Sequence, residues 1–182
     1  EEYDKLLTNK TRIVAVNHVS NALGTINPVN EITRKAHAVG AKVLIDGAQS
    51  TPHMKVDVQG INCDFYTFSG HKMYAPSGIG GMFGKMEVME TMPLYVTGGD
   101  MIMQVTLEKT TYAKPPARFD AGTPPISQVI GLGAAIDYLN AIGMDKIFKY
   151  EKSLLDYGTR LLNDIDGLRI IGNAEEKAAI LS

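Results

Sequence analysis

A lysine and an aspartate occupy positions where they could take part in chemistry. Asp46 directly follows the apolar run Lys42–Ile45, and Lys72 comes shortly after the run Cys63–Phe68. In open α/β sheets, ligands bind beyond the carboxyl ends of the strands, so we expect both side chains at one crevice. Such a pair usually forms a salt bridge. The residues next to Lys72 indicate whether the pair has a chemical role instead.

Lys72 ends the segment Ser69-Gly70-His71-Lys72, which brings a hydroxyl, an imidazole and an amine together after one predicted strand. Partial burial near another cation lowers the pKa of a lysine amine, and the neutral amine can attack an aldehyde. Pyridoxal phosphate carries such an aldehyde. It also needs an acid beside its ring nitrogen, because a protonated ring withdraws electrons from the substrate. Asp46 is suitably placed for that role, so the pair fits this cofactor.

The elements that must position this pair follow the pattern of an α/β fold. Ile13–Val16 is a β-branched run that ends near Asn17, as expected for a buried strand that opens into a loop. Asn27 is predicted to cap a helix that starts at Pro28 and carries apolar residues at helical spacing. With the strand Lys42–Ile45, this makes a βαβ unit with parallel strands and a right-handed crossover.

Two further strands are predicted at Cys63–Phe68 and Ile79–Phe83, each bounded by Gly, Ser or Pro. We therefore expect an α/β fold with a mostly parallel mixed sheet flanked by helices. The segment 91–125 is rich in Gly, Pro and Thr with little periodicity, and a loop of that length is usually functional. The expected division is a large domain over residues 1–140 and the start of a small domain over residues 141–182.

Two helices follow the long loop, and a short apolar segment comes near the end of the chain. Each helix carries one apolar stripe, which we expect to be core. The stripes consist of Val129, Leu132, Ile136 and Leu139 in the first helix and of Ile147, Tyr150, Leu154, Tyr157, Leu161 and Ile165 in the second. Leu168–Ile171 is predicted to be a strand with nothing left to pair with before Ser182.

Composition and charge exclude several classes of function. The chain holds 18 basic and 20 acidic residues, and a formal net charge of -2 offers no field for nucleic acid or anionic lipid. No apolar run approaches the ~20 residues of a membrane span, so we expect a soluble protein. A single cysteine excludes an internal disulfide, so we expect a reducing, cytoplasmic setting. Cys63 is the only cysteine, and its place in a strand pattern predicts a core residue. His37 and His53 fall on a helix and a loop without partnered carboxylates, so no metal site is predicted.

Three motifs together resemble one family of enzymes. They are Asp46-Gly47-Ala48-Gln49, Ser69-Gly70-His71-Lys72-Met73-Tyr74 and Arg118-Phe119-Asp120-Ala121-Gly122-Thr123-Pro124. In this order they resemble the group II cysteine desulfurases and selenocysteine lyases, a branch of the class V aminotransferases with PLP fold type I. The resemblance runs essentially the whole length and includes His18-Val19-Ser20-Asn21 and Asp64-Phe65-Tyr66. The Ser-Gly-His-Lys block is specific to this branch.

The resemblance implies a role for each matching residue. Lys72 holds pyridoxal phosphate as a Schiff base and later shuttles the Cα proton, while Asp46 pairs with the ring nitrogen. The other implied cofactor contacts are Gln49 and Asn21 near the ring oxygen, and Ser69 and His71 at the phosphate. Thr123, together with Gly98 and Gly99, lies in loops that in relatives reach the active site of the neighbouring subunit, so a homodimer is implied.

The same resemblance implies an enzyme that removes sulfur or selenium from L-cysteine or L-selenocysteine, gives L-alanine and passes sulfur to an acceptor protein. Relatives are longer: an earlier segment supplies a phosphate loop and a stacking ring, and a later one supplies the nucleophilic cysteine and a substrate-binding arginine. Ala75 and Pro125 stand where relatives usually carry glycine and asparagine, so local loop geometry could differ. Two alternatives stay open, a class V aminotransferase or epimerase and a non-catalytic fragment that binds little or no cofactor.

Overall fold

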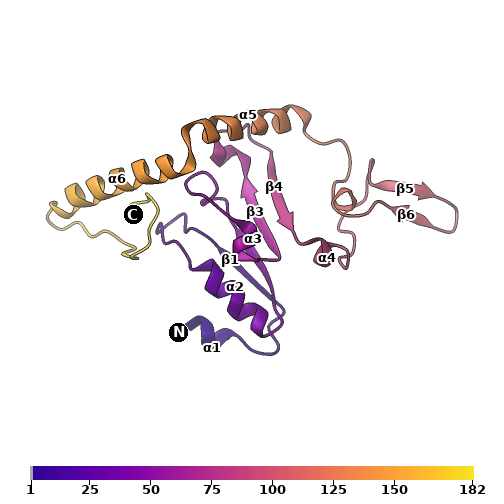
Figure 1. Ribbon diagram of the computed structural model, residues 1–182, viewed down its shortest axis with the longest axis horizontal. Helices are drawn as coiled ribbons and strands as arrows, with labels where there is room; N and C mark the ends of the chain where they lie inside the picture. Colours follow the sequence, from indigo (N-terminus) through magenta and orange to yellow (C-terminus); the bar gives the residue numbers. More distant parts are fainter. Residues whose placement is uncertain (1) are drawn as a thin grey trace.

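Four strands form the sheet on which the predicted residues lie (Figure 1). In the computed structural model, which describes residues 2–182, they are β1 (Ile13–Asn17), β2 (Lys42–Asp46), β3 (Phe65–Ser69) and β4 (Gly80–Gly84). The order is β1-β2-β3-β4, with β1, β2 and β3 parallel and β4 antiparallel to β3. The predicted α/β fold with a mostly parallel mixed sheet is therefore confirmed.

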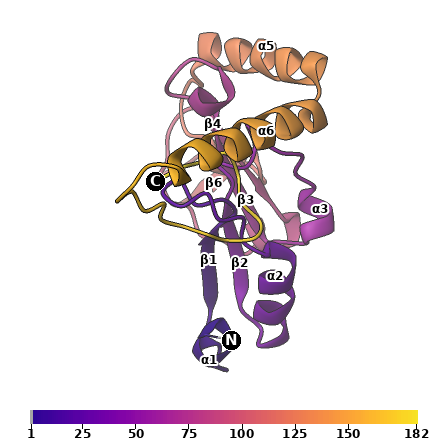
Figure 2. The ribbon, with the colours of Figure 1, turned by 90° about the vertical axis from the view of Figure 1, so that its left-hand side faces the viewer.

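Helix α2 (Val29–Ala38) connects β1 to β2 and covers one face of the sheet (Figure 2). Its Ala36 packs in one core with Val43 and Ile45 of β2, which are fully buried, and with Cys63. Burying an aliphatic side chain of this size stabilises a fold by about 1.5–3 kcal/mol. The prediction that Cys63 is a core residue is confirmed.

The prediction that Asn27 caps α2 is wrong. Pro28 occupies the N-cap position, and no side-chain cap hydrogen bond is formed there. The Asn27 amide nitrogen instead donates to the backbone carbonyl of Asn17 at 2.8 Å and to its side-chain oxygen at 2.9 Å. Because Asn17 is the last residue of β1, this asparagine joins the approach to the helix to the end of the strand.

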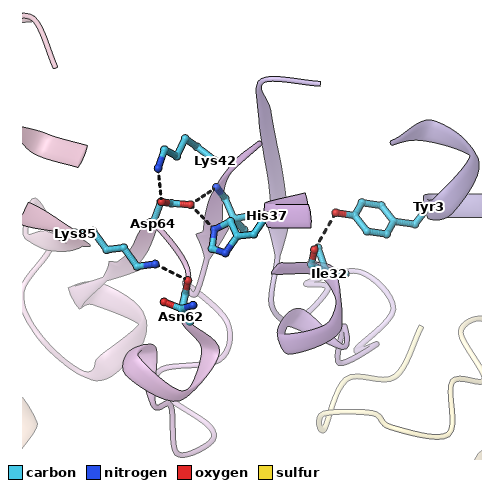
Figure 3. A network of polar contacts seen from close by, with 8 residues as sticks. Tyr3, Ile32, His37, Lys42, Asn62, Asp64 and Lys85 are labelled. Carbon is cyan, nitrogen blue, oxygen red and sulfur yellow. Dashed lines mark hydrogen bonds and ion pairs between the residues drawn. The ribbon is translucent and has the colours of Figure 1, made fainter. Parts of the chain in front are cut away.

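A buried carboxylate ties α2 to the amino ends of β2 and β3 (Figure 3). Asp64 is 1% exposed; its Oδ2 accepts hydrogen bonds from His37 Nε2 and from the Val43 N–H, both at 2.8 Å, and its Oδ1 accepts one from Lys42 at 3.2 Å. Burial alone raises the pKa of Asp64, but these hydrogen bonds outweigh burial and bring the pKa below its ordinary value. The prediction that His37 has no carboxylate partner is therefore wrong.

The segment 91–125 is not a structureless loop. Its strands β5 (Ile102–Val105) and β6 (Thr110–Tyr112) form an antiparallel hairpin that projects away from the sheet (Figure 1). All residues of β5 are exposed, so the alternation that marks a half-buried strand in a sequence is missing. Other short elements are α1 (Glu2–Leu6), α3 (Val58–Ile61), α4 (Met86–Met89) and the 3-10 turns η1 (Gly70–Met73) and η2 (Ala117–Phe119).

Helices α5 (Ile126–Ile142) and α6 (Met144–Asn163) follow each other, and α5 packs on the turn after β3 (Figure 1). The prediction that their apolar stripes are core is wrong for most residues, although Leu139 is buried. The exposed members are Val129, Ile136, Tyr150, Leu154, Tyr157, Leu161 and Ile165. The reason is that α5 and α6 lie at the end of the sheet and do not cover either of its faces.

The C-terminal residues fold back beside the turn after β1 (Figure 2). Thr25 and Lys177 form an isolated antiparallel bridge, and the Ala178 N–H donates to the Gly24 carbonyl at 2.8 Å. Leu168–Ile171, predicted as a strand, is not one in the described structure. These contacts attach the end of the chain to the sheet region.

His53 has a carboxylate partner, contrary to prediction. Its Nδ1 lies 2.9 Å from Oε1 of Glu151 on α6. Within residues 2–182, no three His, Cys, Asp or Glu side chains are grouped so that they could hold a metal ion. No helix in this range combines the length and the apolar character that crossing a membrane requires.

Candidate active site

The parallel strands bring Asp46 and the segment that carries Lys72 to one end of the sheet. Asp46 is the last residue of β2 and is paired in register with Asn17, the last residue of β1, and with Thr67 of β3. Lys72 lies in the 3-10 turn η1 (Gly70–Met73), which directly follows β3. Because Ile45 is buried in the core beneath α2, strand alternation places Asp46 on the opposite face of the sheet.

The chain after Asp46 forms a tight turn around the Gly47 carbonyl. This oxygen accepts hydrogen bonds from the backbone N–H and the hydroxyl of Ser50, and from the backbone N–H and the hydroxyl of Thr51, all at 3.0–3.1 Å. Asp46 Oδ1 accepts a hydrogen bond from the Ala48 N–H at 2.9 Å, which orients the carboxylate. Gln49 is half-buried within this turn. One turn therefore carries two of the predicted cofactor residues.

The turn after β3 carries Ser69 and His71 together with Lys72. The Ser69 hydroxyl lies 2.9 Å from Nδ1 of His71, so the two side chains form a hydrogen-bonded pair. The Gly70 N–H donates to the Ile79 carbonyl at 2.9 Å, and a Cβ at Gly70 would come within 2.8 Å of Ile79. Glycine is therefore needed where this turn passes the start of β4.

Ala75 fits its position without a change of turn. It is buried, and its N–H donates to the Gly70 carbonyl at 3.1 Å. The left-handed conformation in this turn falls on Tyr74, with φ 65°, and not on Ala75. The ring of Tyr138 on α5 packs edge-on against Tyr74 at 5.9 Å between centroids. The departure from the family pattern at Ala75 therefore leaves the turn intact.

The Lys72 amine is half-buried and forms no hydrogen bond or ion pair within residues 2–182. The Asp46 carboxylate likewise has no cationic partner in that range. The plain salt bridge between them is therefore not formed. The strand ends offer an unpaired amine, a carboxylate, a hydroxyl–imidazole pair and an amide. This donor set fits a cofactor with an aldehyde, a basic ring nitrogen and a phosphate.

Two predicted residues belong to exposed loops. Asn21 lies in the turn after β1, where the Gly24 N–H donates to the Ser20 carbonyl at 2.9 Å. Thr123 precedes α5, next to Gly122, whose N–H donates to the Gly99 carbonyl at 2.9 Å. The residues that the structure brings to one end of the sheet are Asn21, Asp46, Gln49, Ser69, His71 and Lys72. Thr123 lies in a separate loop.

Sequence reasoning missed a buried polar network beneath these residues. The Tyr66 hydroxyl lies 2.9 Å from Nδ1 of His18 and 2.5 Å from Oγ of Ser50. All three residues are buried. Burial raises the pKa of Tyr66 to about 12 and lowers the pKa of His18, so both side chains are neutral near pH 7. Tyr66 and His18 are in segments that carry the resemblance, but only the strand register shows that they meet.

The chain belongs to the aminotransferase class-V family, whose model matches residues 1–182. It is 53% identical over 182 residues to a cysteine desulfurase of Synechococcus elongatus, covering 100% of this chain and 29% of the relative. The resemblance inferred from the motifs is thereby confirmed.

Solved structures agree with this assignment. The apo structure of a cysteine desulfurase from Thermococcus onnurineus NA1 matches with a TM-score of 0.93 and 37% identity, covering 100% of this chain and 46% of that one. A structure of a C-DES mutant with glycine covalently linked to its PLP cofactor matches with a TM-score of 0.87, covering 98% of this chain and 48% of that one. At 24% identity, C-DES shows the fold alone. The chain spans less than half the length of these relatives.

Proposed function

We propose that the whole protein is a pyridoxal-phosphate-dependent cysteine desulfurase or selenocysteine lyase. It removes sulfur or selenium from L-cysteine or L-selenocysteine and leaves L-alanine. The observation that carries the proposal is the half-buried, unpaired Lys72 amine at the same end of the sheet as Asp46, in a chain 53% identical to a cysteine desulfurase.

Each residue at the strand ends has a separate role in the proposed reaction. Pyridoxal phosphate, when bound, supplies an electron sink for the substrate Cα. Lys72 holds the cofactor through its amine, then takes and returns the Cα proton. Asp46 keeps a proton at the ring nitrogen. The other side chains that hold the cofactor are Gln49 and Asn21 near the ring oxygen, Ser69 and His71 at the phosphate, and Thr123 from the neighbouring subunit.

Cys63 does not accept the sulfur. It is fully buried just before β3, and burial raises the pKa of its thiol, whereas a reactive cysteine is accessible and readily ionised. It is also the only cysteine among the 182 residues. We infer that a thiol from another segment or protein attacks the substrate sulfur. The carbon–sulfur bond then breaks, and that thiol becomes a persulfide for a sulfur-acceptor protein.

We propose further that the protein is a cytoplasmic homodimer, with Thr123, Gly98 and Gly99 in the loops that meet the neighbouring subunit. The large domain covers residues 1–140, and residues 141–182 begin the small one. This division is supported by Gly143, which separates α5 from α6 with φ 94°.

The test is product analysis with the whole protein and L-cysteine. We expect alanine together with sulfide or persulfide, and a visible absorption band from the bound cofactor. Lys72→Ala should abolish both, while Lys10→Ala, which changes an exposed lysine before β1, at the opposite end of the parallel strands, should keep both. Conversion of an added keto acid to its amino acid would instead identify an aminotransferase, and neither product would indicate a non-catalytic chain.

A further inference from the structure

One buried hydroxyl, carried by β3, connects the segments that follow β1 and β2. Tyr66 belongs to β3, which leads into the turn with Lys72. Its hydroxyl lies 2.9 Å from His18, which follows β1 and leads to Asn21, and 2.5 Å from Ser50 in the turn after β2. The network therefore touches every chain segment of the proposed site except the loop with Thr123.

Backbone hydrogen bonds hold Asp46 between the same strands. The His18 N–H donates to the Asp46 carbonyl at 2.8 Å, and the Gly47 N–H donates to the Thr67 carbonyl at 2.8 Å. The peptide group that follows Asp46 is thus fixed from β1 on one side and from β3 on the other. These backbone hydrogen bonds do not fix the turn that follows, which begins at Gly47 and is closed by Ser50.

The ring of Tyr66 forms the floor of this turn. A Cβ on Gly47 would come within 2.0–2.5 Å of two ring carbons and the hydroxyl oxygen of Tyr66. The His18 ring packs edge-on against Tyr66 with centroids 6.0 Å apart. Tyr66 belongs to the core beneath α2, whereas Asp46 lies on the opposite face of the sheet. Tyr66 therefore acts through the turn and does not reach the cofactor side.

The hydrogen bonds of the network have one consistent direction. The Gly47 carbonyl, 3.1 Å from the Ser50 hydroxyl, can only accept, so Ser50 donates its proton there. The Ser50 oxygen then accepts from the Tyr66 hydroxyl, and the Tyr66 oxygen accepts from Nδ1–H of His18. Tyr66 is the middle link of this chain, and no other hydroxyl within residues 2–182 bridges His18 and Ser50.

We propose that Tyr66 is a positioning residue for the proposed reaction, whose hydroxyl acts through Ser50 and Gly47 to set the orientation of the Asp46 carboxylate toward the cofactor ring nitrogen. The inference rests on the proposed function, because it requires the cofactor ring at Asp46. It gives the buried tyrosine a task beyond core packing, which is to hold the segments after β1 and β2 in one arrangement with β3.

The test compares Tyr66→Phe with wild type in the whole protein at equal occupancy by pyridoxal phosphate. We expect the variant to keep the cofactor on Lys72, with a shifted pH titration of the visible absorption band. We expect kcat with L-cysteine to fall by about 10- to 100-fold, because a misplacement of about 1 Å can cost that much. KM should change little, and a purely structural role would lower stability without moving the band titration.

Tyr3→Phe is the matched control. The Tyr3 hydroxyl also makes a hydrogen bond between distant parts of the chain, to the Ile32 carbonyl at 3.0 Å, but it joins α1 to α2 away from the strand ends. This variant should keep the wild-type titration and kcat. Ser50→Ala should shift the titration in the same direction as Tyr66→Phe. The double variant should show less than the sum of the two effects, since both break one network.

Wild-type titration and kcat in both Tyr66→Phe and Ser50→Ala would overturn the inference, as would an equal shift in Tyr3→Phe. If Tyr66→Phe does not fold, Ser50→Ala decides alone, because it removes a single oxygen. A wild-type protein without a band that depends on Lys72 would instead overturn the proposed function, so the two failures are distinguishable.

Discussion

Gly47 has no room for a side chain, because the Tyr66 ring lies against it. Alanine would place a Cβ 2.0 Å from Cε1 of that ring, so either the ring or the turn must move. We expect Gly47→Ala to lower the free energy of unfolding by about 1–3 kcal/mol, the usual cost of overpacking. It should also weaken cofactor binding, because the same turn carries Asp46. Urea unfolding and cofactor titration of the purified whole protein measure the two effects.

Gly133→Ala in α5 is the control for that substitution. A Cβ at Gly133 meets nothing within 4 Å, and alanine is favoured over glycine inside a helix by about 1 kcal/mol. Its stability should therefore stay unchanged or rise. A Gly47→Ala protein that is as stable as wild type and binds cofactor equally well would show that the Tyr66 ring does not support the turn.

Residue types and spacing predicted that Lys72 and Asp46 lie at the same end of the sheet. Each follows an apolar run, and ligand-binding polar groups collect beyond the carboxyl ends of strands. The same reasoning could not find the role of Tyr66, since a tyrosine inside an apolar run has the pattern of ordinary core packing. Its partners are 16 and 48 residues away in the chain. Only the register of the parallel strands brings Ser50 and His18 to its hydroxyl.

Among the elements, the strands of the main sheet were predictable because they are short apolar runs between Gly, Ser, Asn and Pro. The hairpin of β5 and β6 was not, because the β5 residues are all exposed and carry no alternation. An apolar stripe on a helix predicts that this face of the helix is covered, but it does not predict which part of the protein or which partner covers it. Tyr150 of α6, for example, is 66% exposed within residues 2–182, because α6 does not cover a face of the sheet.

Asp64 makes the attachment of α2 to β2 and β3 depend on pH. Because its pKa is lowered in the folded protein, its ionised form stabilises the fold fully above the unfolded value of 3.8, and this contribution is lost as pH falls through the folded pKa. Asp64→Asn should lower the free energy of unfolding at neutral pH by about 1.5–3 kcal/mol, as for hydrogen bonds to charged groups. The difference from wild type should shrink below pH 3.8.

Urea unfolding at neutral pH and in acid checks this prediction. Asp156→Asn is the control, because Asp156 pairs with Lys152 on the exposed side of α6, where an ion pair contributes little. A difference between Asp64→Asn and wild type that stays constant into acid would show that the charge of Asp64 does not stabilise the attachment.

At the scale of the whole molecule, polar contacts within residues 2–182 attach the segment 141–182 to the sheet region in two areas. One is the edge where Lys177 and Ala178 run beside Gly24 and Thr25. The other is the contact of His53, after β2, with Glu151 on α6. Within residues 2–182, this is the one ion pair that joins α6 to residues before 140. His53 follows the turn with Asp46 by a few residues in the chain.

Glu151→Ala should therefore loosen α6 without unfolding the sheet. The pair is partly exposed, so its loss is expected to cost ~0.5–1 kcal/mol, which corresponds to about 2- to 5-fold faster amide hydrogen exchange in α6. Exchange in β2 and β3 should not change. Lys149→Ala, an exposed change on the same helix, should leave α6 at its wild-type rate. If the exchange rate of α6 in Glu151→Ala also equals that of wild type, the contacts of Lys177 and Ala178 are sufficient to hold α6, and the pair with His53 does not contribute.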